Sequence, residues 1–163
     1  MPPWRSLRRA RESDAGTAPP FSVALLGDVV LGRRARLDGR VAPPEEVWGD
    51  TLALLRTADL RLANLECVLA GQGAAWRDGV KPFHFRASPD HVATLRGAGI
   101  DAVSLANNHA HDFGPDALLE TMRLLDAAGI AHVGAGPAAA SGSLSVKATT
   151  ATRAPARSRT RGA

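Results

Sequence analysis

The residues best suited to chemistry are Asn107, Asn108 and His109, which follow directly on the apolar run 102–106. Carboxamide oxygens and imidazole nitrogens bind divalent cations, and an imidazole also moves a proton near neutral pH. Gly114 and the proline after it then open an amphipathic segment. A strand, a polar cluster and a helix start in this order are typical of a site at the carboxyl end of a strand in an α/β protein. Taken alone, the three residues also fit a tight turn beside a buried histidine.

Two further apolar runs end in polar residues of the same kind. The run 21–26 is followed by Asp28, and the run 60–65 delivers Asn64 and Glu66. If these strands are parallel neighbours, right-handed connections place all three ends on one edge of the sheet. Carboxylate, carboxamide and imidazole groups together suit Mn, Fe, Zn, Mg or Ca. The sequence therefore predicts a site for a divalent metal of unknown identity at this edge.

Hydrophobic periodicity predicts an α/β fold with a mostly parallel sheet and flanking helices. Strands are expected at 22–26, 60–65, 102–106 and 130–133, and helices at 45–57, 89–98 and 115–128. A glycine-rich loop at 70–81 and a short extended segment at 83–86 lie between the second strand and the second helix. Gly99 and Gly129 suit helix ends, where a left-handed backbone is common. On the first turn of the second helix, His91 is expected to be solvated.

Five sequence blocks occur in order along the chain: GDVVLGR at 27–33, NLE at 64–66, FHFRA at 83–87, SLANNHAHDFG at 104–114 and AGIAHVGAG at 128–136. Together they resemble the amino-terminal half of the CapA family of capsule and poly-γ-glutamate biosynthesis proteins, over about residues 21–136. That family is similar in fold to the calcineurin-like metallophosphoesterases. The resemblance therefore implies a partial metallophosphoesterase-like α/β sandwich.

Carried over by position, the resemblance implies that Asp28, Glu66 and Asn108 are metal ligands and that His109 is the catalytic proton donor. The implied substrate is an anionic polymer or a phosphoester, and capsule-biosynthesis proteins are the implied partners. Other residues that could contact the substrate or support the ligands are Arg33, Asn64, Asn107, His84 and His111. Surface positions fit Arg33 and His111 equally well.

Three functions remain open at this stage. The first is a metal-dependent hydrolase acting on a phosphoester or amide bond, with His109 protonating the leaving group. The second is a non-catalytic component that binds or assembles the polymer. The third is an inactive truncated fragment, because the family continues past the last block with further histidine-containing blocks, whereas residues 137–163 hold no histidine and no carboxylate. That segment is expected to derive from a reading-frame change or an early stop.

Charge divides the chain into three parts. The net charge of the 163 residues is +4. Residues 137–163 contain five basic side chains and no acidic ones, residues 1–20 carry +2, and the segment 21–136 therefore carries −3. The first and last parts are expected to be a flexible basic segment and a disordered basic tail around one domain. Specific nucleic-acid binding is not expected, because no aromatic residues interleave with the basic ones.

The remaining features concern redox state and location. Cys67 is the only cysteine, which excludes an intrachain disulfide and favours a small buried apolar role. No apolar run approaches the ~20 residues of a membrane-spanning helix. No apolar segment follows the early arginines as in a standard secretory signal. A cytoplasmic location is therefore the expectation, although the resembling proteins are often associated with the cell envelope.

Overall fold

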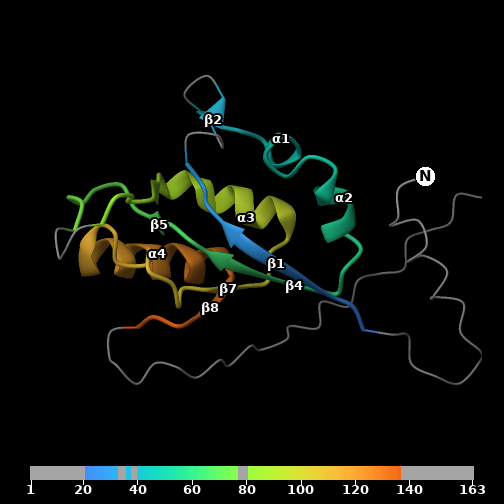
Figure 1. Cartoon of the computed structure of the whole chain (residues 1–163). Helices are drawn as coiled ribbons and strands as arrows, with labels where there is room; N and C mark the ends of the chain where they lie inside the picture. Colours follow the sequence, from blue (N-terminus) through green and yellow to red (C-terminus); the bar gives the residue numbers. More distant parts are fainter. Residues whose placement is uncertain (1–20, 33–35, 38–39, 77–80, 137–163) are drawn as a thin grey trace, which may run out of the picture.

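The structure is a computed structural model that describes residues 21–32, 36–37, 40–76 and 81–136 (Figure 1). The expectations for the terminal segments 1–20 and 137–163 lie outside the described residues, and so does Arg33. Within the described part of the chain, no helix has the length and apolar composition needed to cross a bilayer.

Four parallel strands form the central sheet, and this confirms the expected fold class. They are β1 (Val23–Val29), β4 (Leu60–Leu65), β7 (Ala102–Ser104) and β8 (Ala131–Val133). Their order in the sheet is β1-β4-β7-β8, so each connection advances by one strand in the same direction. All four strand ends therefore lie on the same edge of the sheet.

Helices fill the connections, with one difference from the expected pattern. They are α1 (Pro44–Trp48), α2 (Thr51–Leu55), the short 3₁₀ helix η3 (Pro89–His91), α3 (Val92–Ala98) and α4 (Gly114–Ala128). The single helix expected at 45–57 is wrong, because Gly49 takes φ 54° and ψ −137° and divides it into α1 and α2. Gly99 and Gly129 do end α3 and α4 in the left-handed conformation.

Two small sheets complete the fold. One pairs β2 (Arg36–Leu37) with β3 (Arg40–Val41) in antiparallel fashion. The other pairs β5 (Val68–Leu69) with β6 (Arg86–Ala87) in parallel. Neither pair is signalled by a clear alternation of apolar and polar residues. The second pair matters for the site, because it draws the segment before β6 toward the end of β4.

The core lies on one face of the central sheet. Leu65 and Val103 on that face pack in one cluster with apolar residues of the helices, among them Leu55, Leu95 and Leu125. Connections of one hand that always advance in one direction place their helices on the same face. On the opposite face of the edge strand β1, Val23 is 46% and Leu25 76% exposed. The described helices thus cover one face of the sheet.

An irregularity in β1 sets the direction of its last residues. Leu25 pairs with Leu62, but Asp28 pairs with Asn64, so β1 has one residue more than β4 between these points. An extra residue of this kind is a β-bulge, and it reverses which face the following side chains occupy. Asp28 therefore shares a face with Asn64; without the bulge it would lie on the core face beside Leu65.

The amino edge of the sheet carries a closed polar network centred on Arg61. Its guanidinium donates to the carbonyls of Leu55 (Nε, 2.7 Å), Gly99 (Nη1, 3.1 Å) and Ala58 (Nη2), and Nη1 also donates to Asp101 Oδ2 at 3.0 Å. The same carboxylate oxygen accepts the Arg61 backbone N–H at 2.7 Å. Arg61 thus joins the ends of α2, α3 and the start of β7, and its side chain is only 14% exposed.

His91 differs from its expected solvated position. Its side chain is fully buried, and its Nδ1 lies 2.9 Å from the Ser88 hydroxyl. The 3₁₀ turn η3, directly before α3, therefore places this imidazole inside the fold and away from solvent. Cys67 is buried and free, as expected from its isolated position in the sequence.

Candidate functional site

A chain of hydrogen bonds links the three strand ends at the carboxyl edge of the sheet. Asn64 Nδ2 donates to Asp28 Oδ1 at 2.7 Å, which joins the ends of β4 and β1. Asn107 Nδ2 donates to Asn64 Oδ1 at 3.1 Å, which joins the loop after β7 to the end of β4. The strand ends thus meet in the order in which the strands lie in the sheet.

Asn107 shapes the loop that carries His109. Its Nδ2 also donates to the carbonyl of Leu65 at 3.0 Å, and its Oδ1 accepts the backbone N–H of His109 at 3.0 Å. A carboxamide that accepts from the N–H two residues on is an Asx turn. Asn107 therefore uses both ends of its side chain to fix the loop, as in the turn interpretation of the sequence, while the same bonds tie the loop to Asp28 through Asn64.

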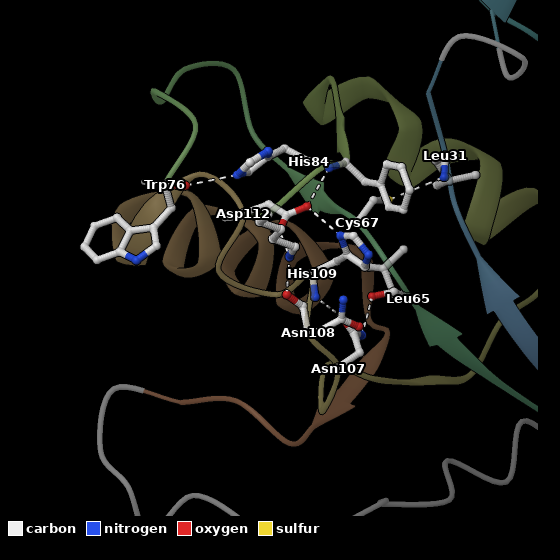
Figure 2. A network of polar contacts seen from close by, with 11 residues as sticks. Leu31, Leu65, Cys67, Trp76, His84, Asn107, Asn108, His109 and Asp112 are labelled. Atoms are coloured by element: carbon white, nitrogen blue, oxygen red, sulfur yellow. Dashed lines mark hydrogen bonds and ion pairs between the residues drawn. The ribbon is translucent and has the colours of Figure 1, made fainter. Parts of the chain in front are cut away.

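His109 is held by a buried carboxylate three residues farther on. Its Nδ1 lies 2.7 Å from Asp112 Oδ2, and the two side chains point toward one another (Figure 2). The Asp112 side chain has no exposed surface and that of His109 is 10% exposed. On the other side, the ring of Phe85 stacks on the imidazole, with centroids 4.2 Å apart and planes inclined by 27°. The imidazole is thus fixed in plane and in rotation.

Three donors converge on Asp112. Besides His109, they are the ammonium of Lys81, which pairs with Oδ1, and the backbone N–H of Phe85, which donates to Oδ2 at 2.5 Å. Burial acts to raise the pKa of the Asp112 carboxyl, but hydrogen bonds from Lys81, His109 and Phe85 outweigh it and lower that pKa below its usual value. The carboxylate is therefore charged at neutral pH despite its burial.

The other expected site residues take different positions. Glu66 directly follows β4 and is half-buried, with its backbone N–H bonded to the Val29 carbonyl at 3.0 Å. Asn108 is exposed, and its backbone carbonyl accepts from Lys81. His84 turns toward the carbonyl of Trp76, 3.0 Å from its Nε2 (Figure 2). Its ring also meets the ring of Phe113 edge-on. His111 is exposed.

Oxygen donors at this edge match hard divalent cations in kind. Among the described residues, one carboxylate oxygen of Asp28 accepts no hydrogen bond. The side chains of Glu66 and Asn108 make no hydrogen bond to the described residues. Such donors suit Mg, Ca or Mn. The described residues do not gather three side chains of histidine, cysteine, aspartate or glutamate around one point. The ligand set of Asp28, Glu66 and Asn108 stays a prediction.

Asp112 and Lys81 are the residues that the sequence reasoning missed. The signal for Asp112 was its place three residues after His109 in a loop, a spacing at which the two side chains can meet. Lys81 carried no signal, because it is brought in by the β5–β6 pairing and by the fold of the segment before β6. Both are polar contacts that only tertiary structure creates.

Comparison with known proteins places these features in a family. A sequence model of the bacterial capsule synthesis protein family (PGA_cap) matches residues 22–154. A probable polyglutamine synthesis accessory protein of Mycobacterium tuberculosis is 39% identical over 155 aligned residues, which cover 75% of this chain and 40% of that protein. The capsule biosynthesis protein CapA of Bacillus anthracis is 26% identical over 117 residues, covering 71% of this chain and 28% of that protein. The chain therefore spans about two fifths or less of the length of these relatives. With the family match over most of its length, the chain belongs to the bacterial capsule synthesis protein family.

Proposed function

We propose that this chain acts in the synthesis of a capsule-type polymer of amino acids, such as poly-γ-glutamate, and that the carboxyl edge of its sheet binds a divalent cation. Two relatives bear names that refer to polyglutamine synthesis and to capsule biosynthesis. The observation that carries the proposal is the hydrogen-bonded chain Asp28–Asn64–Asn107, which leads to the loop of His109. Partners within the polymer-synthesis machinery follow from the same names.

In this proposal Asp28, Glu66 and Asn108 hold the cation, and Asn64 orients the carboxylate of Asp28. When bound, a divalent cation would polarise a phosphoryl or amide oxygen and activate water. His109 protonates the leaving group, as a histidine does in general acid catalysis. Asn107 sets the distance between His109 and the cation ligands, because it contacts both the His109 backbone and Asn64.

Metal titration tests the site directly. Purified chain is titrated with Mn²⁺ by calorimetry, and Asp28→Ala is compared with Asp116→Ala. Asp116 is a matched control because it is an exposed carboxylate on the first turn of α4. Asp28→Ala is expected to weaken Mn²⁺ binding by ~10-fold or more, since a charged oxygen ligand is lost. Equal binding by wild type and Asp28→Ala would remove the metal site from the proposal.

A second candidate is a polymer-binding component without hydrolysis. It is favoured by the finding that the described residues do not bring three metal-binding acidic, histidine or cysteine side chains to one point. Co-sedimentation with poly-γ-glutamate, with and without EDTA, separates the two. Retention of the polymer that survives EDTA, without cleavage of the polymer in Mn²⁺, supports the second candidate. Cleavage in Mn²⁺ that is lost in His109→Gln supports the first.

A further inference from the structure

We infer that Asp112 is a positioning residue that holds His109 as the Nδ1–H tautomer, which leaves Nε2 as the ring nitrogen available for chemistry. A carboxylate only accepts hydrogen bonds, so the 2.7 Å contact with Nδ1 requires a proton on that nitrogen. In the neutral imidazole the other nitrogen then carries a lone pair. The assignment of the tautomer stands on the geometry alone. Only the role given to Nε2, as a proton donor or a metal ligand, rests on the proposed function.

The surroundings of Asp112 keep it in this role. Oδ2 accepts both from His109 Nδ1 and from the backbone N–H of Phe85, and Oδ1 pairs with Lys81. Neither oxygen is free to rotate away without breaking a bond to the segment before β6. Because the carboxylate is fully buried, water does not compete for the bond to His109.

Phe85 adds a second constraint on the same ring. It contributes its backbone N–H to Asp112 and its aromatic face to His109, so one residue orients both members of the pair. A flip of the imidazole would break the bond to Asp112 and leave a buried carboxylate short of a donor, which is costly. The tautomer is therefore set by the fold before any substrate or cation arrives.

The chemical consequence refines the role of His109. A neutral His109 offers Nε2 as a base or a metal ligand, and it becomes a proton donor at Nε2 only as the imidazolium, which the carboxylate of Asp112 stabilises. Histidines paired with a carboxylate through Nδ1 act through Nε2 in this way in both catalysis and metal binding.

Imidazole ¹⁵N NMR tests the inference without any need for turnover. Spectra are recorded on metal-free chain in EDTA at about pH 8.5, well above the reference pKa of a free imidazole, and His109→Gln identifies the signals of His109. Wild type is expected to show Nδ1 protonated and Nε2 unprotonated. In Asp112→Asn the charged acceptor is gone, and the signals are expected to shift toward the Nε2–H form that free histidine prefers. The control Asp116→Asn is expected to match wild type.

Several outcomes would overturn the inference. They are a wild-type His109 protonated at Nε2, or an Asp112→Asn protein whose His109 tautomer is unchanged. If Asp112→Asn fails to fold because the ammonium of Lys81 loses its carboxylate partner, the double variant Lys81→Met/Asp112→Asn removes both charges and is measured in its place. If neither variant folds, the wild-type tautomer alone decides. None of these readings depends on Mn²⁺ binding, so the proposed function and this inference can fail separately.

Discussion

The two edges of the parallel sheet both carry charged hydrogen-bond networks, but they differ in whether every charged group in the network has all its partners. At the amino edge the guanidinium of Arg61 donates hydrogen bonds to three backbone carbonyls and to the carboxylate of Asp101. At the carboxyl edge the bonds run through Asn64 and Asn107 and leave an oxygen of Asp28 without a partner among the described residues. A closed network holds elements together, whereas an open one holds side chains in place for a ligand. This difference supports the carboxyl edge as the place of the proposed site.

The largest effect is expected from opening the closed network. Arg61→Met leaves Asp101 and three carbonyls without their donor, and is expected to lower the free energy of unfolding by about 3 kcal/mol. The matched control is Arg56→Met, because Arg56 pairs with Glu45 across 3.3 Å while both side chains stay more than half exposed. That control should cost less than about 1 kcal/mol. Urea denaturation measures both, and equal losses would contradict the distinction between the networks.

A smaller effect is expected from acid. The pKa of Asp112 is lowered in the fold, so its contribution to stability is present above the pKa of an unfolded aspartate, about 3.9. This contribution is lost as the pH falls through the lower folded value. Denaturation midpoints measured from about pH 5 downward should fall more steeply for wild type than for the double variant Lys81→Met/Asp112→Asn. Parallel curves would show that Asp112 is not linked to stability.

Near the carboxyl edge, removal of a ligand is expected to leave stability almost unchanged. Asp28 is exposed, and its side chain bonds to Asn64 alone within the described residues. Asp28→Ala should therefore change the free energy of unfolding by no more than about 0.5 kcal/mol, even though it weakens Mn²⁺ binding. A loss near that of Arg61→Met would make Asp28 a structural residue and would weaken the comparison.

The smallest effect is expected at Cys67, which lies next to Glu66 but on the core side. Burial raises the pKa of its thiol to about 11, with a weak opposing contribution from the Leu31 N–H at 3.4 Å. The folded chain should therefore not react with a thiol reagent near neutral pH, while the urea-unfolded chain should take up one equivalent. Fast labelling of the folded chain would contradict this expectation, because it would mean that the reagent reaches the Cys67 thiol at the carboxyl edge without global unfolding.

The sequence was sufficient for the sheet and for the meeting of its strand ends. Period and chain order predict four parallel strands, and a side chain that follows an apolar run must lie at a strand end, as Asp28 and Asn64 do. It was not sufficient where a contact depends on tertiary packing. His91 fits a solvated first turn by its local pattern but has no exposed surface in the fold. In the sequence Asp112 looks like an ordinary loop aspartate. Its role depends on hydrogen bonds from Lys81 and Phe85, which only the folded structure brings into contact with it.

The break between α1 and α2 has a related cause. The apolar positions from Trp48 to Leu55 keep helical spacing across the break, so periodicity alone predicts one helix. Gly49 permits a backbone conformation that interrupts the hydrogen bonds while both halves keep their apolar sides on the core. Side-chain spacing reports which face is buried; it does not report whether the backbone is continuous.

The extra residue in β1 makes the site respond differently to a deletion and to an insertion in this strand. Gly27 has no neighbour within 4 Å of the position a Cβ would take, so there is space there for Gly27→Ala and Asp28 keeps its direction. Deleting Gly27 removes the extra residue, so that Leu26 takes the place opposite Ala63 and Asp28 still pairs with Asn64, on the face away from Leu65. The loss of one codon would thus straighten the strand and leave the carboxylate at the carboxyl edge, whereas one residue inserted before Asp28 with the bulge retained would move that carboxylate opposite Leu65, onto the core face.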